Sequence, residues 1–265
     1  MYIEDPNPTG HQAVLMLHGL GASSLMWRYQ LEFLSRLGYR PLAPDLPGFG
    51  RSFGVGADLS GRRTIEALKQ ALNQLGVSQV DVVGLSMGGV LAQKLAVQQP
   101  QLVRRLMLAS TFARLVPANF QQRWYFLRRF FTVFFLSPSA QAGLVANTVF
   151  PKPEFQQIRQ MYVSQVEKAN PVSYRAALLM LATHRLGNGL HDFGKPAWVI
   201  AGAEDTTVVI EQQRDLASHI HGARMVVVPN AGHGLSVECP DVFNQHLLSW
   251  LETSLLESEM PDCLN

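Results

Sequence analysis

The stretch Val80-Asp81-Val82-Val83-Gly84-Leu85-Ser86-Met87-Gly88-Gly89 decides the fold. Its first half has the composition of a buried strand, a helix-forming segment follows at once, and a serine stands at the junction. A strand that reverses sharply into a helix forces its central residue into a strained backbone conformation, which bulky residues two positions away on either side would prevent. Gly84 and Gly88 remove that obstruction.

This turn predicts a nucleophile at Ser86. The serine would stand at the carboxyl end of a strand and the amino end of a helix, where free N–H groups and the helix dipole favour a developing negative charge. Glycine-rich turns of this length also occur without any catalytic role. A serine hydroxyl is a poor nucleophile at neutral pH, so a base and an acid that orients the base must be found elsewhere in the sequence.

His233 is the predicted base. It follows the apolar run Met225 to Val228 through Pro229-Asn230-Ala231-Gly232, a loop at the carboxyl end of a predicted strand. The other histidines occupy predicted helices, the ends of a long insertion or the region before the first strand; these are His219, His221, His246, His184, His191 and His11.

Asp205 is the predicted acid. It lies in Gly202-Ala203-Glu204-Asp205-Thr206, also at the carboxyl end of a predicted strand, where open α/β sheets place their sites. Aspartate is common in turns without a catalytic role. However, the chain order serine, aspartate, histidine is that of hydrolases with a nucleophile on a sharp turn. Asp192 precedes its strand and would lie at the wrong end of the sheet.

The loop His18-Gly19-Leu20-Gly21 follows the first strong strand and supplies a predicted oxyanion site. Its glycines let the main chain turn in close, so the N–H of Leu20 can join that of Met87 in binding an oxyanion. His18 is interpreted as a structural residue that braces this loop through hydrogen bonds to the backbone.

Apolar runs alternate with segments of helical period along the chain, which predicts a parallel sheet covered on both faces. The predicted strands are 13–17, 39–43, 80–83, 105–109, 197–201 and 224–228, and the predicted helices are 26–37, 62–75, 87–98, 212–219 and 240–256. The stretch 112–185 is far longer than one crossover needs and contains no convincing strand, so it is predicted to be a helical insertion.

Residues 113–185 hold half of the aromatic side chains of the chain. We expect most of these rings to pack the insertion onto the core. Some could instead line an apolar substrate channel, and a helix carrying Arg123, Arg128 and Arg129 could lie on anionic lipid. The predicted substrate contacts are Trp27, Trp124, Phe130 and Phe134, with Phe49 as a further candidate that core packing explains equally well.

The composition excludes several classes of function. With 22 basic and 20 acidic residues and no basic stripe, nothing favours nucleic acid, and the expected ligand is small and not strongly charged. The start lacks the features of a secretory signal, so a cytoplasmic location is expected. The apolar run 124–136 is too short to span a membrane. Cys239 and Cys263 have no metal-binding spacing and are expected to be free thiols, and the predicted chemistry needs no metal or cofactor.

Five segments in this order resemble the α/β-hydrolase superfamily. They are His18-Gly19-Leu20-Gly21, Asp45-Leu46-Pro47-Gly48-Phe49-Gly50-Arg51-Ser52, Gly84-Leu85-Ser86-Met87-Gly88-Gly89, Gly202-Ala203-Glu204-Asp205, and Gly232-His233 followed by Glu238 and Pro240. The resemblance implies an α/β fold with a mostly parallel sheet flanked by helices and a helical lid inserted after the sixth family strand. The core would comprise 1–112 and 186–265, and the lid 113–185. Few residues precede the first strong strand, so the sheet edge is expected to be short there.

The resemblance implies a cofactor-independent serine hydrolase that cleaves carboxylic esters of apolar acyl or aryl groups through an acyl-enzyme. Enol-lactone hydrolysis and carbon–carbon bond hydrolysis are alternatives on the same fold, and a ligand receptor that keeps a slow triad is another. Serine at the turn argues against the haloalkane dehalogenases and epoxide hydrolases, which carry aspartate there.

Overall fold

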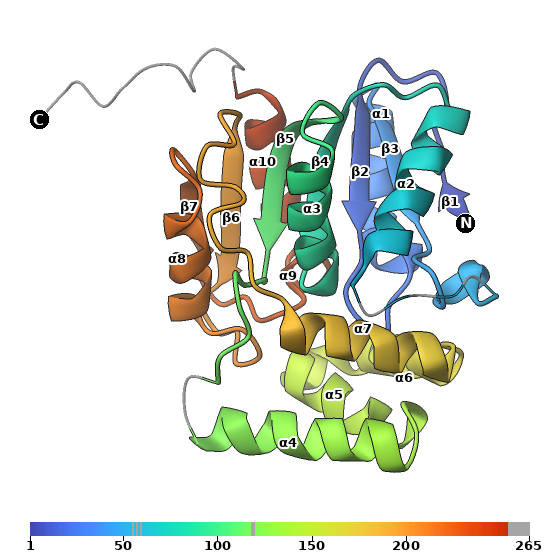
Figure 1. Ribbon diagram of the computed structural model, residues 1–265, viewed down its shortest axis with the longest axis vertical. Coiled ribbons are helices and arrows are strands. Elements are labelled where there is room, and N and C mark those ends of the chain that lie inside the picture. The colour runs from blue at the N-terminus through green and yellow to red at the C-terminus, as the bar shows by residue number, and fades with distance from the viewer. Residues whose placement is uncertain (55, 57, 59, 118–119, 254–265) are drawn as a thin grey trace, which may run out of the picture.

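The computed structural model describes residues 1–54, 56, 58, 60–117 and 120–253 (Figure 1). Its centre is a seven-stranded sheet in the order β1-β3-β2-β4-β5-β6-β7. Six strands run parallel, and β1 (Ile3–Glu4) pairs antiparallel with β3 at one edge. The predicted α/β fold with a mostly parallel sheet is confirmed.

The six predicted strands all form, with small shifts at their ends. They are β2 (Ala13–Leu17), β3 (Arg40–Pro44), β4 (Val80–Leu85), β5 (Val103–Ala109), β6 (Ala197–Gly202) and β7 (Arg224–Val228). Both β4 and β6 are buried along their whole length, which explains why they are mostly apolar and do not alternate; the charged exception, Asp81 of β4, pairs with Arg104 and Arg105. The sequence analysis missed β1, because two residues are too short to show any periodicity.

Helices cover both faces of the sheet. In Figure 1, α2 (Arg62–Gln74) and α3 (Met87–Gln98) lie in front of it, and α1 (Arg28–Arg36) and α10 (Pro240–Leu251) lie behind. The helix α8 (Ile210–Ser218) packs against β6 and β7. Two short helical segments flank the loops of the site: a 3₁₀ turn at Ser24–Trp27 before α1, and α9 (Leu235–Glu238) after β7. The predicted helix 240–256 is too long, because α10 ends at Leu251; residues 254–256 lie outside the described residues.

The helical insertion between β5 and β6 forms as predicted. It contains α4 (Phe120–Phe135), α5 (Ala142–Val149), α6 (Gln156–Glu167) and α7 (Pro171–Thr183). The start of α7 shows how the sequence sets a boundary, because Asn170 caps two free N–H groups and Pro171 occupies the first turn. Figure 1 places the insertion below the carboxyl ends of the strands, with α4 outermost. An isolated bridge between Arg114 and Arg185 joins the two ends of the insertion.

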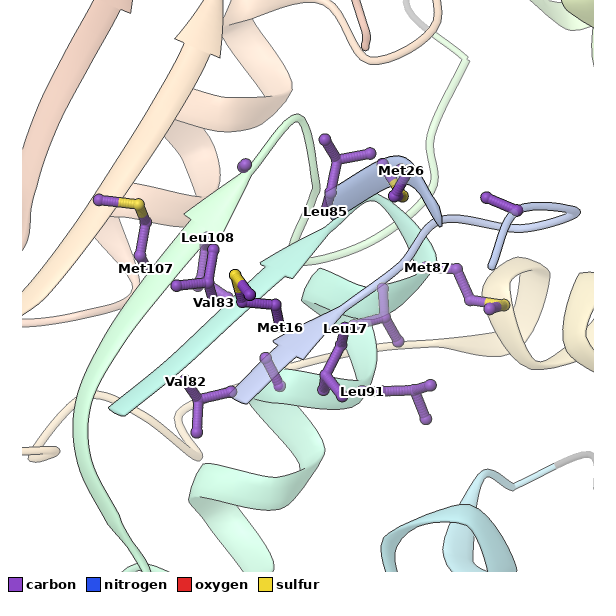
Figure 2. Packing of buried hydrophobic residues seen from close by; sticks show 14 of the residues in the cluster. Met16, Leu17, Met26, Val82, Val83, Leu85, Met87, Leu91, Met107 and Leu108 are labelled. Carbon is purple, nitrogen blue, oxygen red and sulfur yellow. The ribbon is translucent and has the colours of Figure 1, made fainter. Parts of the chain in front are cut away.

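The core is built from apolar side chains on the central strands. Figure 2 shows Met16, Val83 and Leu108, from β2, β4 and β5, with Leu91 of α3 beside the sheet. All four are fully or almost fully buried. Burial of such a side chain contributes about 1.5–3 kcal/mol to folding. These apolar contacts hold the central strands together and thereby hold in place the strand ends that carry the site.

The turn from β4 into α3 is built on close backbone contacts. Ser86 has φ +54° and ψ −112°, a conformation that L-residues rarely adopt. A Cβ on Gly84 would lie 2.3 Å from the carbonyl oxygen of Gly88, and a Cβ on Gly88 would lie 1.9 Å from that of Leu17. The turn therefore tolerates only glycine at these two positions.

The aromatic side chains of α4 do not behave as expected. Phe120, Trp124, Phe131 and Phe135 are more than half exposed, and Phe130 is partly exposed, so the prediction that most of these rings pack onto the core is wrong for this helix. The face turned toward the protein carries Gln122, Arg129 and Val133 instead. Unlike an ordinary surface helix, α4 therefore buries two polar side chains and leaves several aromatic ones exposed.

Within the described residues, no helix combines the length and apolar character needed to cross a membrane. Cys239 is a free thiol, and burial raises its pKa to about 11, so it is not a reactive thiolate at neutral pH. Cys263 lies outside the described residues.

Gly88→Ala tests the packing of the turn. We expect the free energy of unfolding to fall by about 1–3 kcal/mol or more, because the new methyl group would overlap the Leu17 carbonyl group. Urea denaturation followed by circular dichroism measures this change.

The matched control is Gly143→Ala, in the first turn of α5, where a Cβ meets no atom within 4 Å. Its stability should stay the same or rise by up to about 1 kcal/mol. Equal effects of the two substitutions would contradict the proposed packing.

Candidate active site

Ser86 stands at the amino end of α3 and is held there from three directions. Its N–H donates to Ala109 O (2.9 Å), while its carbonyl oxygen accepts from Thr111 Oγ1 (2.8 Å) and Val90 N (3.1 Å). These bonds to β5, the loop after it and α3 fix the strained backbone. The side chain is only partly buried and lines a cavity.

Asp205 and His233 form a buried pair at the ends of β6 and β7. His233 Nδ1 lies 2.9 Å from Asp205 Oδ2, and both residues are more than nine-tenths buried. Asp205 Oδ1 accepts from the backbone N–H groups of Thr207 (2.8 Å) and Val208 (2.9 Å). These donors fix the carboxylate, so we assign the histidine tautomer that donates from Nδ1 and leaves a lone pair on Nε2.

Glu238 holds the loop that carries His233. Its two carboxylate oxygens accept from the N–H groups of Gly232 (2.7 Å) and Gly234 (2.8 Å), on either side of the histidine. Burial raises the pKa of Glu238, and the two N–H donors and His233 only partly oppose that shift. Glu238 belongs to one of the sequence motifs, but no role was predicted for it.

The loop 18–21 approaches the nucleophile closely. A Cβ built on Gly19 would lie 3.7 Å from Ser86 Cβ. Among the described residues, no hydrogen bond uses the N–H of Leu20 or Met87. Both groups are therefore available as donors beside the serine.

His18 braces this loop, as predicted. Its Nδ1 lies 2.8 Å from Gly19 O, and its Nε2 accepts from Leu46 N at 2.9 Å. Burial lowers the pKa of His18 to about 4, so the ring is neutral at ordinary pH and can keep both bonds.

Three of the candidate residues line a cavity of about 70 Å³ between the strand ends and the insertion. Ser86, Leu20 and His233 lie in its wall on the core side, and Arg129 and Tyr162 belong to the insertion. The remaining wall is mostly apolar, with Met26, Val145 and Phe150 among its members.

The insertion is bound to the loops of the site. Tyr162 of α6 donates to the Leu20 carbonyl oxygen (2.8 Å), and Ser23 donates to Gln165 Oε1 (2.8 Å). On α4, Gln122 Nε2 donates to Thr207 O at 3.1 Å, beside Asp205. Movement of these helices would therefore disturb both the loop 18–21 and the loop that carries Asp205.

The structure places the predicted aromatic substrate contacts outside the cavity wall. Trp27 is fully buried and packs against Phe243, with ring centroids 6.0 Å apart. Trp124 is 63% exposed, and the exposed Phe130 stacks on Phe134, which is half-buried against the core. Phe49 is buried against His18 and Tyr174. Trp124 and Phe130 were predicted as substrate contacts because their face of α4 was expected to point inward, but both side chains are exposed.

Sequence reasoning missed Arg129 and Tyr162 as cavity residues. The pattern of α4 gave no signal for Arg129, because charged side chains are expected on the solvent face of a helix. Within the described ranges, no group of three or more His, Cys, Asp or Glu side chains is arranged to hold a metal ion.

Residues 12–240 match the sequence pattern of the alpha/beta hydrolase fold family. The chain belongs to this family. Ser86, Asp205 and His233 all fall within the matched region.

Curated relatives and solved structures are distant but cover nearly the whole chain. The (E)-2-((N-methylformamido)methylene)succinate hydrolase of Acinetobacter baylyi is 25% identical over 250 residues, covering 92% of this chain and 91% of that protein. A Thermogutta terrifontis esterase, solved with malate bound, is 26% identical with a TM-score of 0.80, covering 94% and 92% of the two chains. The Burkholderia xenovorans enol-lactonase, 22% identical with a TM-score of 0.84 and 95% of each chain covered, is similar in fold.

Asp205→Asn tests the assignment of the acid. We expect kcat for p-nitrophenyl acetate to fall by about 10³ to 10⁴, because the amide favours the wrong histidine tautomer. Steady-state kinetics at neutral pH measures the loss.

Glu204→Gln is the matched control, one residue away. Glu204 is about half exposed and pairs with Lys152 (2.8 Å), so its loss should leave kcat unchanged. A large loss in the Glu204 variant with none in the Asp205 variant would show that the acid has been misassigned.

Proposed function

We propose that the protein is a serine hydrolase that cleaves carboxylic esters through an acyl-enzyme. Ser86 is the nucleophile, His233 the base and Asp205 the acid that orients it. The N–H groups of Leu20 and Met87 form the oxyanion hole. The insertion 113–185 acts as the lid of the site, and the core comprises 1–112 and 186–265.

In the proposed first step, Ser86 Oγ attacks the ester carbonyl carbon while His233 Nε2 takes the hydroxyl proton. The charge that develops on the carbonyl oxygen is stabilised by the two N–H groups. His233 then returns the proton to the leaving alcohol. Water, activated by the same histidine, cleaves the acyl-enzyme and frees Ser86.

One observation carries this proposal. Ser86 and His233 come from different strand ends and line the same cavity, and Asp205, from a third strand end, binds His233 from behind it. Strain at a non-glycine residue is costly and is retained mainly where the surrounding structure enforces a function. A nucleophile, an oriented base and two free N–H donors are the parts that acyl transfer needs.

The apolar wall of the cavity favours an ester with an apolar portion next to the scissile bond. The Thermogutta terrifontis relative is an esterase at 26% identity, which supports ester hydrolysis here.

A second candidate is hydrolysis of a bond from an acyl carbon to nitrogen or carbon. The Acinetobacter baylyi relative is named for a succinate that carries an N-methylformamido group and no ester. The same serine and oxyanion donors would act on such a carbonyl group, and product analysis distinguishes the two reactions.

Pre-steady-state kinetics with p-nitrophenyl acetate tests the acyl-enzyme. Wild-type protein should release about one p-nitrophenolate per active site in a burst before the steady state. Ser86→Ala should abolish the burst and lower kcat by about 10⁶.

Ser110→Ala is the control, because Ser110 is a buried serine with positive φ at the end of the neighbouring strand β5. Its burst should equal that of the wild type. An undiminished rate in the Ser86 variant would exclude the serine mechanism.

A further inference from the structure

Arg129 of α4 is an unusual component of the cavity wall. Its side chain is 7% exposed, and it lines the same cavity as Ser86 and His233. A guanidinium stays charged at any ordinary pH, and burying a charge is unfavourable unless an opposite charge is paired with it. Arg129 in this position is therefore expected to have an anionic partner.

The protein supplies no such partner among the described residues. Arg129 takes part in none of their ion pairs, and its Nε is buried without a hydrogen-bond acceptor. Within the described part of the chain, its one hydrogen bond runs from Nη2 to Tyr174 Oη (3.2 Å), an uncharged group that also accepts from Gln141 Nε2 (3.1 Å). The sequence contains no Asp or Glu between Asp81 and Glu154.

The rest of the cavity is equally free of negative charge. None of its described lining residues is acidic, and apart from Arg129 the lining side chains are apolar or uncharged polar ones and His233. A guanidinium has five N–H donors in a planar fork that matches a carboxylate, and one bond to a tyrosine satisfies few of them. The cavity thus joins a reactive serine to an unneutralised cation.

The geometry points to Arg129 as a binding site for a carboxylate group of the substrate. The inference rests on the proposed ester hydrolysis and narrows its substrate class to esters that carry a free carboxylate away from the scissile bond. A substrate with a carboxylate differs from the ligand expected from the composition, which was small and not strongly charged. The carboxylate can belong to the acyl part, as in a monoester of a dicarboxylic acid, or to the alcohol part.

Two pairs of esters distinguish these sources. For the acyl part, p-nitrophenyl hydrogen glutarate is compared with p-nitrophenyl valerate, which has the same carbon chain without the charge. For the alcohol part, 4-acetoxybenzoate is compared with phenyl acetate. In one pair at least, wild-type protein should show a higher kcat/KM for the charged ester.

Arg129→Gln should remove this preference. We expect kcat/KM for the preferred charged ester to fall by about 10- to 100-fold and that for its neutral partner to change by no more than about twofold. Arg128→Gln is the matched control, because Arg128 is the neighbouring arginine and is exposed. It should leave both values unchanged.

Two results would overturn the inference. One is a wild-type preference for the neutral ester in both pairs, a result that does not depend on the folding of any variant. The other is an equal loss on charged and neutral esters in Arg129→Gln, which would make Arg129 a structural residue.

A binding measurement separates this inference from the proposed function. Calorimetry with Ser86→Ala protein should show binding of glutarate but not of neutral glutaramide, and adding Arg129→Gln should weaken glutarate binding at least about tenfold. If no ester were hydrolysed but glutarate bound in this way, ester hydrolysis would fail and the anion site would stand. Equal glutarate binding with and without Arg129 would overturn the site.

Discussion

The close approach of α3 to β2 is the constraint on which the rest of the structure depends. Gly88 lies so near the Leu17 carbonyl group that no side chain fits between them, and this contact forces the chain to reverse within one residue. Ser86 bears the resulting strain at φ +54°. The same contact brings the loop after β2 beside the serine, so the proposed nucleophile and the proposed oxyanion donors are positioned by one packing interaction.

The second organising feature is that α4 buries polar side chains and exposes aromatic ones. An ordinary surface helix buries its apolar side chains, yet α4 turns Arg129 and Gln122 inward and leaves Trp124 and Phe131 exposed. Each inward polar group contacts the site: Gln122 binds the carbonyl group of Thr207 beside the acid, and Arg129 lines the cavity. The inner face of this helix is therefore better suited to binding a polar ligand than to packing, and burial of an unpaired cation is a stability cost that binding can offset.

Most of the fold and of the candidate site could be predicted from the sequence, because the information is local. The strands β4 and β6 are mostly apolar, Ser86 follows β4 directly, and Asp205 and His233 lie in the loops that follow β6 and β7. The predictions that failed depended on the orientation of a helix relative to the core. The sequence shows that α4 is aromatic but not which face meets the core, so Trp124 and Phe130 were predicted inside the site and Arg129 was not. Glu238 was equally hidden, because its role depends on two backbone N–H groups that only the folded loop brings within reach.

The central claim is that the strained turn presents Ser86 as the one activated nucleophile of the protein. Peptide mapping by mass spectrometry after treatment with a fluorophosphonate tests it most directly, since such reagents phosphonylate a serine only when a base and an oxyanion site activate it. The account predicts one adduct per chain, located on Ser86, and none in Ser86→Ala. An adduct on a different residue, or unimpaired esterase activity in protein without any adduct, would contradict it.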